Sequence, residues 1–186
     1  LPSELYALAN LKTLNLASNA FNGSIANTIG NLMLMTQLNF DNNDLTGTLP
    51  ASIRNMSQLS FLSCVNNALT GTLPVQWSNL SMLSSLQIAS NQISGTIPPE
   101  WGNLSFMNFV FADQNYISGT IPYSFLSITS LRVLELPMNL LSGSVPSETA
   151  HPHTQLIDLS IGVNRMTGSI PHNISTYKRL NGLNIT

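Results

Sequence analysis

The sequence predicts an α/β-type repeat solenoid: a curved right-handed coil with a parallel β-sheet on its concave face and irregular or 3-10 turns on its convex face. One asparagine returns after 24 residues five times in succession and then once after 25. A glycine four residues later keeps the same step, as does a proline seven residues later from the second repeat onward. The asparagines are Asn19, Asn43, Asn67, Asn91, Asn115, Asn139 and Asn164. Self-similarity at a fixed period of this size is the signature of stacked coils.

The segment ahead of each asparagine predicts a short strand. In the fourth repeat, the apolar residues Leu86 and Ile88 flank the polar residue Gln87. This period of two is typical of a strand with one buried face. Side chains six, four and two positions before each asparagine are therefore expected to face the concave surface.

The segment after each asparagine predicts a turn and a return path. Glycine permits a positive φ and proline removes a backbone donor, so "SGTIP" is expected to leave the sheet and run along the far side. Apolar residues ten and thirteen positions after the asparagine complete the coil, as in Trp77 with Leu80 and Trp101 with Leu104.

The repeated asparagine is expected to hold neighbouring coils together. No single coil can bury its apolar row alone, so the coils share one continuous core. An amide pointing into that core is expected to bond backbone groups of its own coil and the next, since a buried amide without partners costs about 1–3 kcal/mol.

The frame LxxLxLxxNxLxGxIP resembles the leucine-rich repeat, and its GxIP half resembles the plant-type subclass of plant receptor-kinase ectodomains and cell-wall proteins. The phrases "GTLPVQW" and "GTIPPEW" also resemble the coils of trypanosomatid leucine-rich surface antigens, in which PPEW recurs. The resemblance implies a secreted or surface-anchored protein whose concave sheet binds another molecule.

Length and composition narrow the classes of function. The chain has 186 residues, 43% hydrophobic and 8% charged, with a formal charge of −2. Its length fits one domain over residues 1–186 with about seven and a half coils, and we expect a segment of a longer protein without its caps. The six Lys and Arg residues are scattered, so we expect no nucleic-acid partner. The sequence contains no run of 18 apolar residues, so we expect no membrane span within this segment.

The sequence gives no reason to propose catalysis, a cofactor or a metal. Glu135 and Asp158 lie on adjacent predicted strands, within the separation of a glycosidase pair, but we interpret them as a solvated ion cluster with Arg132 nearby. His151 and His153 have no evident third ligand, so no metal site is expected there. No Ser-His-Asp order, phosphate loop or CxxC motif is visible.

The single cysteine, Cys64, occupies a core position of the frame and is expected to be a buried thiol rather than a reactive one. The same frame position is held in other repeats by Leu16, Phe40, Ile88 and Leu136.

The predicted ligand-binding site consists of exposed apolar side chains on the concave face with charged residues close by in the frame. Its members are Phe61, Val65, Phe109, Phe111, Asp113, Arg132, Val133 and Glu135. Aromatic groups ringed by polar ones are typical of binding hot spots. The alternative interpretation is drift, because single apolar residues are normal on protein surfaces.

Six N-glycosylation sequons occur, and three of them share one convex frame position where a glycan would not block a concave site. The candidate acceptors at this position are Asn55, Asn79 and Asn103.

These observations favour a non-catalytic extracellular module that binds a protein or peptide ligand. One alternative is ice binding through two columns of hydroxyls, Thr46 with Thr48, Thr70 with Thr72, Ser94 with Thr96 and Ser118 with Thr120. Another is a cell-wall protein or an inhibitor of secreted hydrolases. The sequence names neither the ligand nor the oligomeric state.

Overall fold

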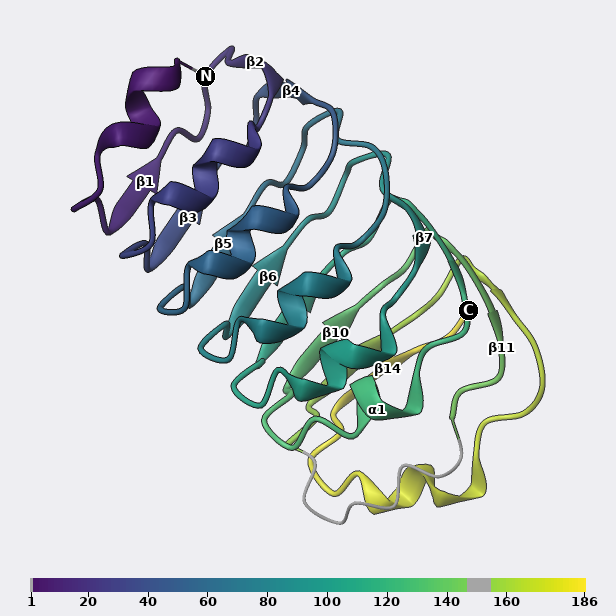
Figure 1. Cartoon of the computed structure of the whole chain (residues 1–186). Coiled ribbons are helices and arrows are strands. Elements are labelled where there is room, and N and C mark those ends of the chain that lie inside the picture. The colour runs from purple at the N-terminus through teal and green to yellow at the C-terminus, as the bar shows by residue number, and fades with distance from the viewer. Residues whose placement is uncertain (1, 147–154) are drawn as a thin grey trace.

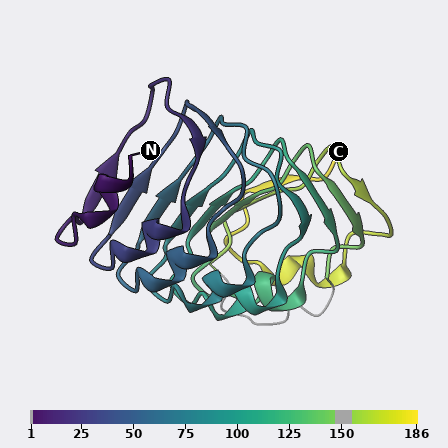
Figure 2. The same ribbon diagram turned by 45° about the horizontal axis from the view of Figure 1, so that its top comes forward.

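The computed structural model describes residues 2–146 and 155–186. One side of each coil contributes a strand to an eight-stranded parallel sheet, and the short helices lie on the opposite side (Figures 1 and 2). The strands are β1 (Thr13–Asn15), β3 (Gln37–Asn39), β5 (Phe61–Ser63), β6 (Ser85–Gln87), β8 (Phe109–Phe111), β10 (Val133–Glu135), β12 (Asp158–Ser160) and β14 (Gly182–Asn184). Residues at the same frame position pair across neighbouring strands, as Leu62 does with Leu86. The predicted solenoid is confirmed.

The far side of the coils carries mostly 3-10 helices. These are η1 (Ser3–Ala7), η2 (Asn27–Asn31), η3 (Ala51–Asn55), η4 (Val75–Asn79), η5 (Pro99–Asn103) and η6 (His172–Thr176), with a single α-helical turn at α1 (Tyr123–Leu126). An extended residue precedes η1 to η5 and α1, and Pro50, Pro74 and Pro98 supply it for η3 to η5. The fixed φ of proline suits that position. In the part of the chain described, no helix has the length and apolar character needed to cross a membrane.

The "SGTIP" segment differs from the prediction, because it pairs with its equivalents instead of only turning. A four-stranded parallel sheet contains β7 (Ser94–Thr96), β9 (Tyr116–Gly119), β11 (Leu140–Gly143) and β13 (Arg165–Met166), and a two-stranded sheet contains β2 (Asn22–Ser24) and β4 (Asp44–Thr46). Isolated bridges from Thr48 to Thr70 and from Thr72 to Ser94 continue the pairing between them. Identical coils bring equivalent N–H and C=O groups into register, so pairing follows from the stack.

The glycine that returns in every repeat has a steric role where the "SGTIP" segments pair. Gly71 has a φ of +78°, and a Cβ added to it would lie 2.6 Å from the Cγ2 methyl of Thr48 in the preceding coil. Both the left-handed backbone and the close approach of the neighbouring coil therefore require glycine.

The core runs through the stack as one apolar cluster. The far-side positions identified in the sequence are buried, as shown by Trp77, Leu80, Trp101 and Leu104. The middle residue of a strand also points into the core: in β8, Val110 is buried, whereas Phe109 and Phe111 on either side of it are only partly buried.

The asparagines form the expected ladder, but they bond the preceding coil and not the next. The Nδ2 of Asn91 donates to the carbonyl of Cys64 in the preceding coil at 2.8 Å and to two carbonyls of its own coil. Its Oδ1 accepts the backbone N–H of Leu69, also in the preceding coil, at 3.0 Å. Asn43, Asn115, Asn139 and Asn164 repeat this pattern, whereas the exposed Asn19 donates only to carbonyls of its own coil.

Candidate functional site

The concave face is the surface of the eight-stranded sheet opposite the core, made of side chains six, four and two positions before each repeat asparagine. In β8, the side chains of Phe109 and Phe111 lie on this face while Val110 between them is buried. The sequence predicts exposed side chains at both positions; in the structure both phenylalanines are half-buried, and a strand pairs with β8 on either side.

Strand register decides which of the predicted site residues meet. Phe109 pairs with Ser85 on one side and with Val133 on the other, and Phe111 pairs with Gln87 and with Glu135. Three apolar side chains are therefore contiguous, and we call Phe109, Phe111 and Val133 the apolar patch. The patch borders the polar side chains of Ser85 and Gln87 on β6.

Phe61 and Val65 lie at some distance from this patch. Phe61 is separated from Phe109 by Ser85, in the same row of paired residues. Val65 follows β5 in the same coil, and its backbone N–H donates to a carboxylate oxygen of Asp41 at 2.7 Å. Both side chains are half-buried. The sequence-predicted site thus divides into the apolar patch and a smaller apolar area two strands away.

The charged members of the predicted site border the apolar patch. Asp113 and Glu135 are half-buried, and Arg132 is exposed directly before β10. Burial, followed by the nearby carboxylates of Asp158 and Asp113, raises the pKa of Glu135 above its ordinary value. Like charges and desolvation together are typical of functional sites, although structural clusters show them as well.

Asp158 is a patch neighbour that the predicted site omitted. It pairs with Val133 across β10 and β12, in the row that contains Phe109. Counting six residues back from Asn164 identifies this position in the sequence. The sequence alone places it with Glu135 in a solvated ion cluster, whereas the strand register places it at the border of the apolar patch.

The other residues that the sequence offers for chemistry are Cys64, His151 and His153. Cys64 is a free, buried thiol, as predicted, and burial together with the Asp41 carboxylate raises its pKa. His151 and His153 lie outside the described residues. Among the residues that are described, no group of three His, Cys, Asp or Glu side chains is arranged to hold a metal ion.

The three candidate glycan acceptors lie where their frame position predicted. Asn55, Asn79 and Asn103 are each the last residue of a 3-10 helix, η3, η4 and η5, and all three are exposed. The helices pack against one another in sequence order on the side away from the concave face. A glycan on any of them would therefore leave the apolar patch accessible.

The two hydroxyl columns proposed for ice binding differ in their hydrogen bonding. In the first column, Thr70, Ser94 and Ser118 donate to the carbonyls of glycines in the preceding coils at 3.1–3.2 Å. The second column is exposed and consists of Thr48, Thr72, Thr96 and Thr120. The hydroxyl protons of Thr70, Ser94 and Ser118 are thus used within the fold, so the first column is less regular toward water than the exposed second column.

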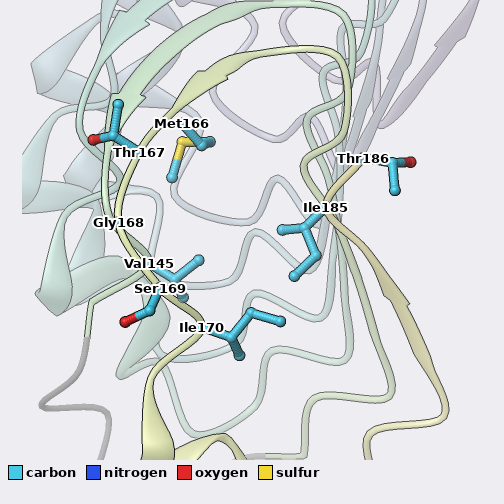
Figure 3. A pocket seen from close by; sticks show the side chains of 8 residues that line it. All are labelled: Val145, Met166, Thr167, Gly168, Ser169, Ile170, Ile185 and Thr186. Atoms are coloured by element: carbon cyan, nitrogen blue, oxygen red, sulfur yellow. The ribbon is translucent and has the colours of Figure 1, made fainter.

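A hollow at the C-terminal end of the stack is lined mainly by apolar side chains, among them Val145, Met166, Ile170 and Ile185 (Figure 3). Val145 and Ile170 hold the frame position six residues after the repeat asparagine, where Ile97 and Ile121 are buried inside the stack. The hollow is thus lined by side chains at positions that form the core inside the stack. Its apolar lining follows from the repeat and does not indicate a ligand.

Comparison with known proteins agrees with this architecture. A model of the family described as Leucine Rich Repeat matches residues 10–32, 35–56 and 82–104. No curated protein has a matching sequence.

Three solved structures illustrate the similarity. The plant peptide hormone receptor RGFR1, solved with RGF2, has 33% identity and a TM-score of 0.96 over 100% of this chain and 30% of its own. The ectodomain of the Arabidopsis receptor kinase HAESA, solved with an IDA peptide hormone, has 32% identity and a TM-score of 0.92 over 98% of this chain and 31% of its own. A plant ice-binding protein shares the fold at 24% identity and a TM-score of 0.85, over 100% of this chain and 59% of its own. The chain thus spans about a third of the length of the two receptor chains that it resembles.

Proposed function

We propose that this chain, a leucine-rich-repeat protein with the plant-type 24-residue repeat, is a non-catalytic extracellular module that binds a peptide or protein ligand on its concave face. The observation that carries the proposal is the pair Phe109 and Phe111, held side by side on the open face of β8 and continued by Val133. Aromatic side chains ringed by polar ones provide most of the binding energy in many interfaces.

The surroundings of the apolar patch support this proposal. The neighbouring concave positions on β6 are Ser85 and Gln87, and the next strand beyond Val133 presents Asp158 and Ser160. A ligand segment lying across the strands would bury the rings against a polar rim that stays in contact with water. The receptor ectodomains described above bind peptide hormones, and their structural similarity covers all or nearly all of this chain.

The extracellular setting is proposed on two grounds. The structurally similar proteins include a plant peptide hormone receptor and the ectodomain of a receptor kinase, and the exposed sequons at Asn55, Asn79 and Asn103 would be acceptors in a secretory compartment. Glycans at these positions would cover the convex turns and leave the concave face open to a ligand.

Panning a library of linear peptides against the chain tests the proposed function. Peptides that bind the wild type are then measured on a variant carrying Phe109→Ser and Phe111→Ser, for which we expect affinity to fall by at least about tenfold. Phe21→Ser with Phe106→Ser is the matched control, because these two phenylalanines are exposed outside the concave face. Circular dichroism and urea midpoints establish that both variants stay folded. Equal affinity of all three proteins would place the binding surface elsewhere.

A further inference from the structure

Charge is distributed unevenly between the concave face and the rest of the solenoid. Four of the chain's eight acidic residues lie in the three outward columns of the sheet, all of whose positions are described, and none of the six lysines and arginines does. The four are Asp41, Asp113, Glu135 and Asp158. Two bases lie next to the face along the chain, Lys12 directly before β1 and Arg132 directly before β10, and both are exposed. The face therefore complements a positively charged ligand.

Asp41 shows what an aspartate in this frame position does when it serves the fold. One of its carboxylate oxygens accepts the hydroxyl of Ser63 at 2.5 Å and the backbone N–H of Val65 at 2.7 Å, both from the next coil. Its charge is therefore used to join two coils.

Asp113 occupies the same frame position three repeats later, but the next coil offers it neither donor. Glu135 replaces the serine and Pro137 replaces the valine. Proline has no backbone N–H, and an ionised glutamate has only acceptors. The hydrogen bond that Asp113 accepts comes from the Gln114 side chain in its own coil, at 3.1 Å. Asp113 and Glu135 thus lie on neighbouring coils, close enough for Asp113 to raise the pKa of Glu135, without the donors that Ser63 and Val65 give to Asp41.

Asp158 extends this acidic group by one strand. It lies one coil beyond Glu135 and two residues nearer the start of the strand. Asp113, two residues past the end of β8, Glu135 on β10 and Asp158 on β12 therefore form a diagonal across three coils. Neighbouring strands lie about 4.8 Å apart and two residues span about 6.6 Å along a strand, so diagonal neighbours are about 8 Å apart. Burial, followed by repulsion from Asp158 and Asp113 along this diagonal, raises the pKa of Glu135. A cation placed between two of the carboxylates would remove the repulsion.

The apolar patch lies directly beside the acidic diagonal. Phe111 pairs with Glu135, and Val133 lies between Phe109 and Asp158. An arginine or lysine side chain matches this combination, because its aliphatic stem packs on apolar groups while its charged head reaches the carboxylates. A phenylalanine face adds cation–π attraction. A metal ion does not match, since no three ligating side chains among the described residues are arranged to hold one.

We infer that the concave face binds an extended peptide segment whose arginine or lysine side chain lies against Phe111 and Val133 and pairs with Asp113, Glu135 and Asp158. This inference rests on the proposed function and adds to it the chemical class of the ligand. The peptide backbone lies across the strands, and an apolar residue next to the cation packs on Phe109.

Peptide selection with a charge-neutral variant tests the inference. Random linear peptides displayed on phage are panned against the wild-type chain and against a variant with Asp113→Asn, Glu135→Gln and Asp158→Asn. We expect the wild type to select peptides with arginine or lysine beside an aromatic or aliphatic residue, and the variant to lose that preference. A selected peptide and its version with citrulline in place of arginine are then compared by calorimetry. Citrulline should weaken binding to the wild type by at least about tenfold, as expected for charge-assisted hydrogen bonds.

A second variant separates this site from the effect of net charge. Glu4→Gln, Asp44→Asn and Glu100→Gln remove the same number of charges from residues outside the concave face. This variant should select the same cationic peptides as the wild type. Circular dichroism and urea midpoints establish that both variants fold.

The possible outcomes distinguish the inference from the proposed function. Peptides that require Phe109 and Phe111 but show no preference for a cation would overturn the inference and leave the proposed function standing. A failure to select any peptide that depends on the two phenylalanines would overturn both. Self-association of the wild type in sedimentation experiments, abolished by Phe109→Ser with Phe111→Ser, would assign the face to a second copy of the chain and also overturn the inference.

Discussion

The indole rings of Trp77 and Trp101 stack across adjacent coils, with centroids 6.2 Å apart and planes inclined by 9°. Each indole N–H also donates to a proline carbonyl in the preceding coil, Trp77 to Pro50 and Trp101 to Pro74, both at 3.0 Å. Phe125 follows in the next coil, with its ring centroid 6.3 Å from that of Trp101. An aromatic column thus joins η4, η5 and α1.

Replacing Trp101 tests how much this column stabilises the fold. We expect Trp101→Ala to lower the free energy of unfolding by about 3–5 kcal/mol, because a fully buried aromatic side chain leaves a cavity in the stack. Trp101→Phe keeps a ring in the column but leaves the Pro74 carbonyl without its donor, so its loss should be smaller. Urea unfolding followed by circular dichroism measures both. Equal losses for the two variants would show that the ring contacts contribute little.

The asparagine ladder makes a second prediction with an internal control. Asn91→Ala removes three donated hydrogen bonds and one accepted bond, and leaves the N–H of Leu69 without its partner. We expect a loss of about 1–3 kcal/mol in the free energy of unfolding. Asn19→Ala removes two bonds within one exposed coil and should have a clearly smaller effect. Coincident urea midpoints for wild type and Asn91→Ala would contradict the role given to the ladder.

The sequence predicted those features that depend on position within one coil. Alternation around Val110 is sufficient to put that side chain in the core and Phe109 and Phe111 on the open face, because successive strand side chains point in opposite directions. Features that depend on how coils stack were either not predicted or predicted with the wrong neighbouring coil. The strand Ser94–Thr96 is made of residues with turn chemistry, and its pairing arises from the register of neighbouring coils, a tertiary effect that local propensity does not report.

The candidate site shows the same division. The aromatic residues could be predicted from their frame positions, whereas the loss of donors around Asp113 emerges only when it is compared with the hydrogen bonds of Asp41. The direction of the asparagine bonds, toward the preceding coil, likewise depends on the relative placement of two coils and not on the repeat itself.

Cys64 gives a prediction about reactivity. Its side chain is 1% exposed, and burial together with Asp41 raises the pKa of its thiol, so the thiolate is disfavoured in the folded chain. We expect no reaction with a disulfide reagent at about pH 8 until urea unfolds the protein, after which one thiol per chain reacts. Ser81→Cys, at an exposed position, is the control that should react in the folded state. Rapid labelling of Cys64 in the folded wild type would contradict its placement in the core.

Glu135 gives a prediction about the dependence of stability on pH. Because burial and the carboxylates of Asp158 and Asp113 raise the pKa of Glu135 in the folded chain, folding favours its protonated form. The resulting stabilisation is present below the pKa of the unfolded chain and is lost as the pH rises through the folded pKa. Glu135→Gln keeps the shape and cannot ionise, so its free energy of unfolding relative to wild type should increase between about pH 4 and about pH 7. The increase should be small, because the side chain is partly solvated.

Urea unfolding at both pH values measures this increase, with Glu100→Gln on η5 as the control for loss of a charge. A relative stability of the Glu135→Gln variant that falls as the pH rises would show that the acidic diagonal does not repel Glu135.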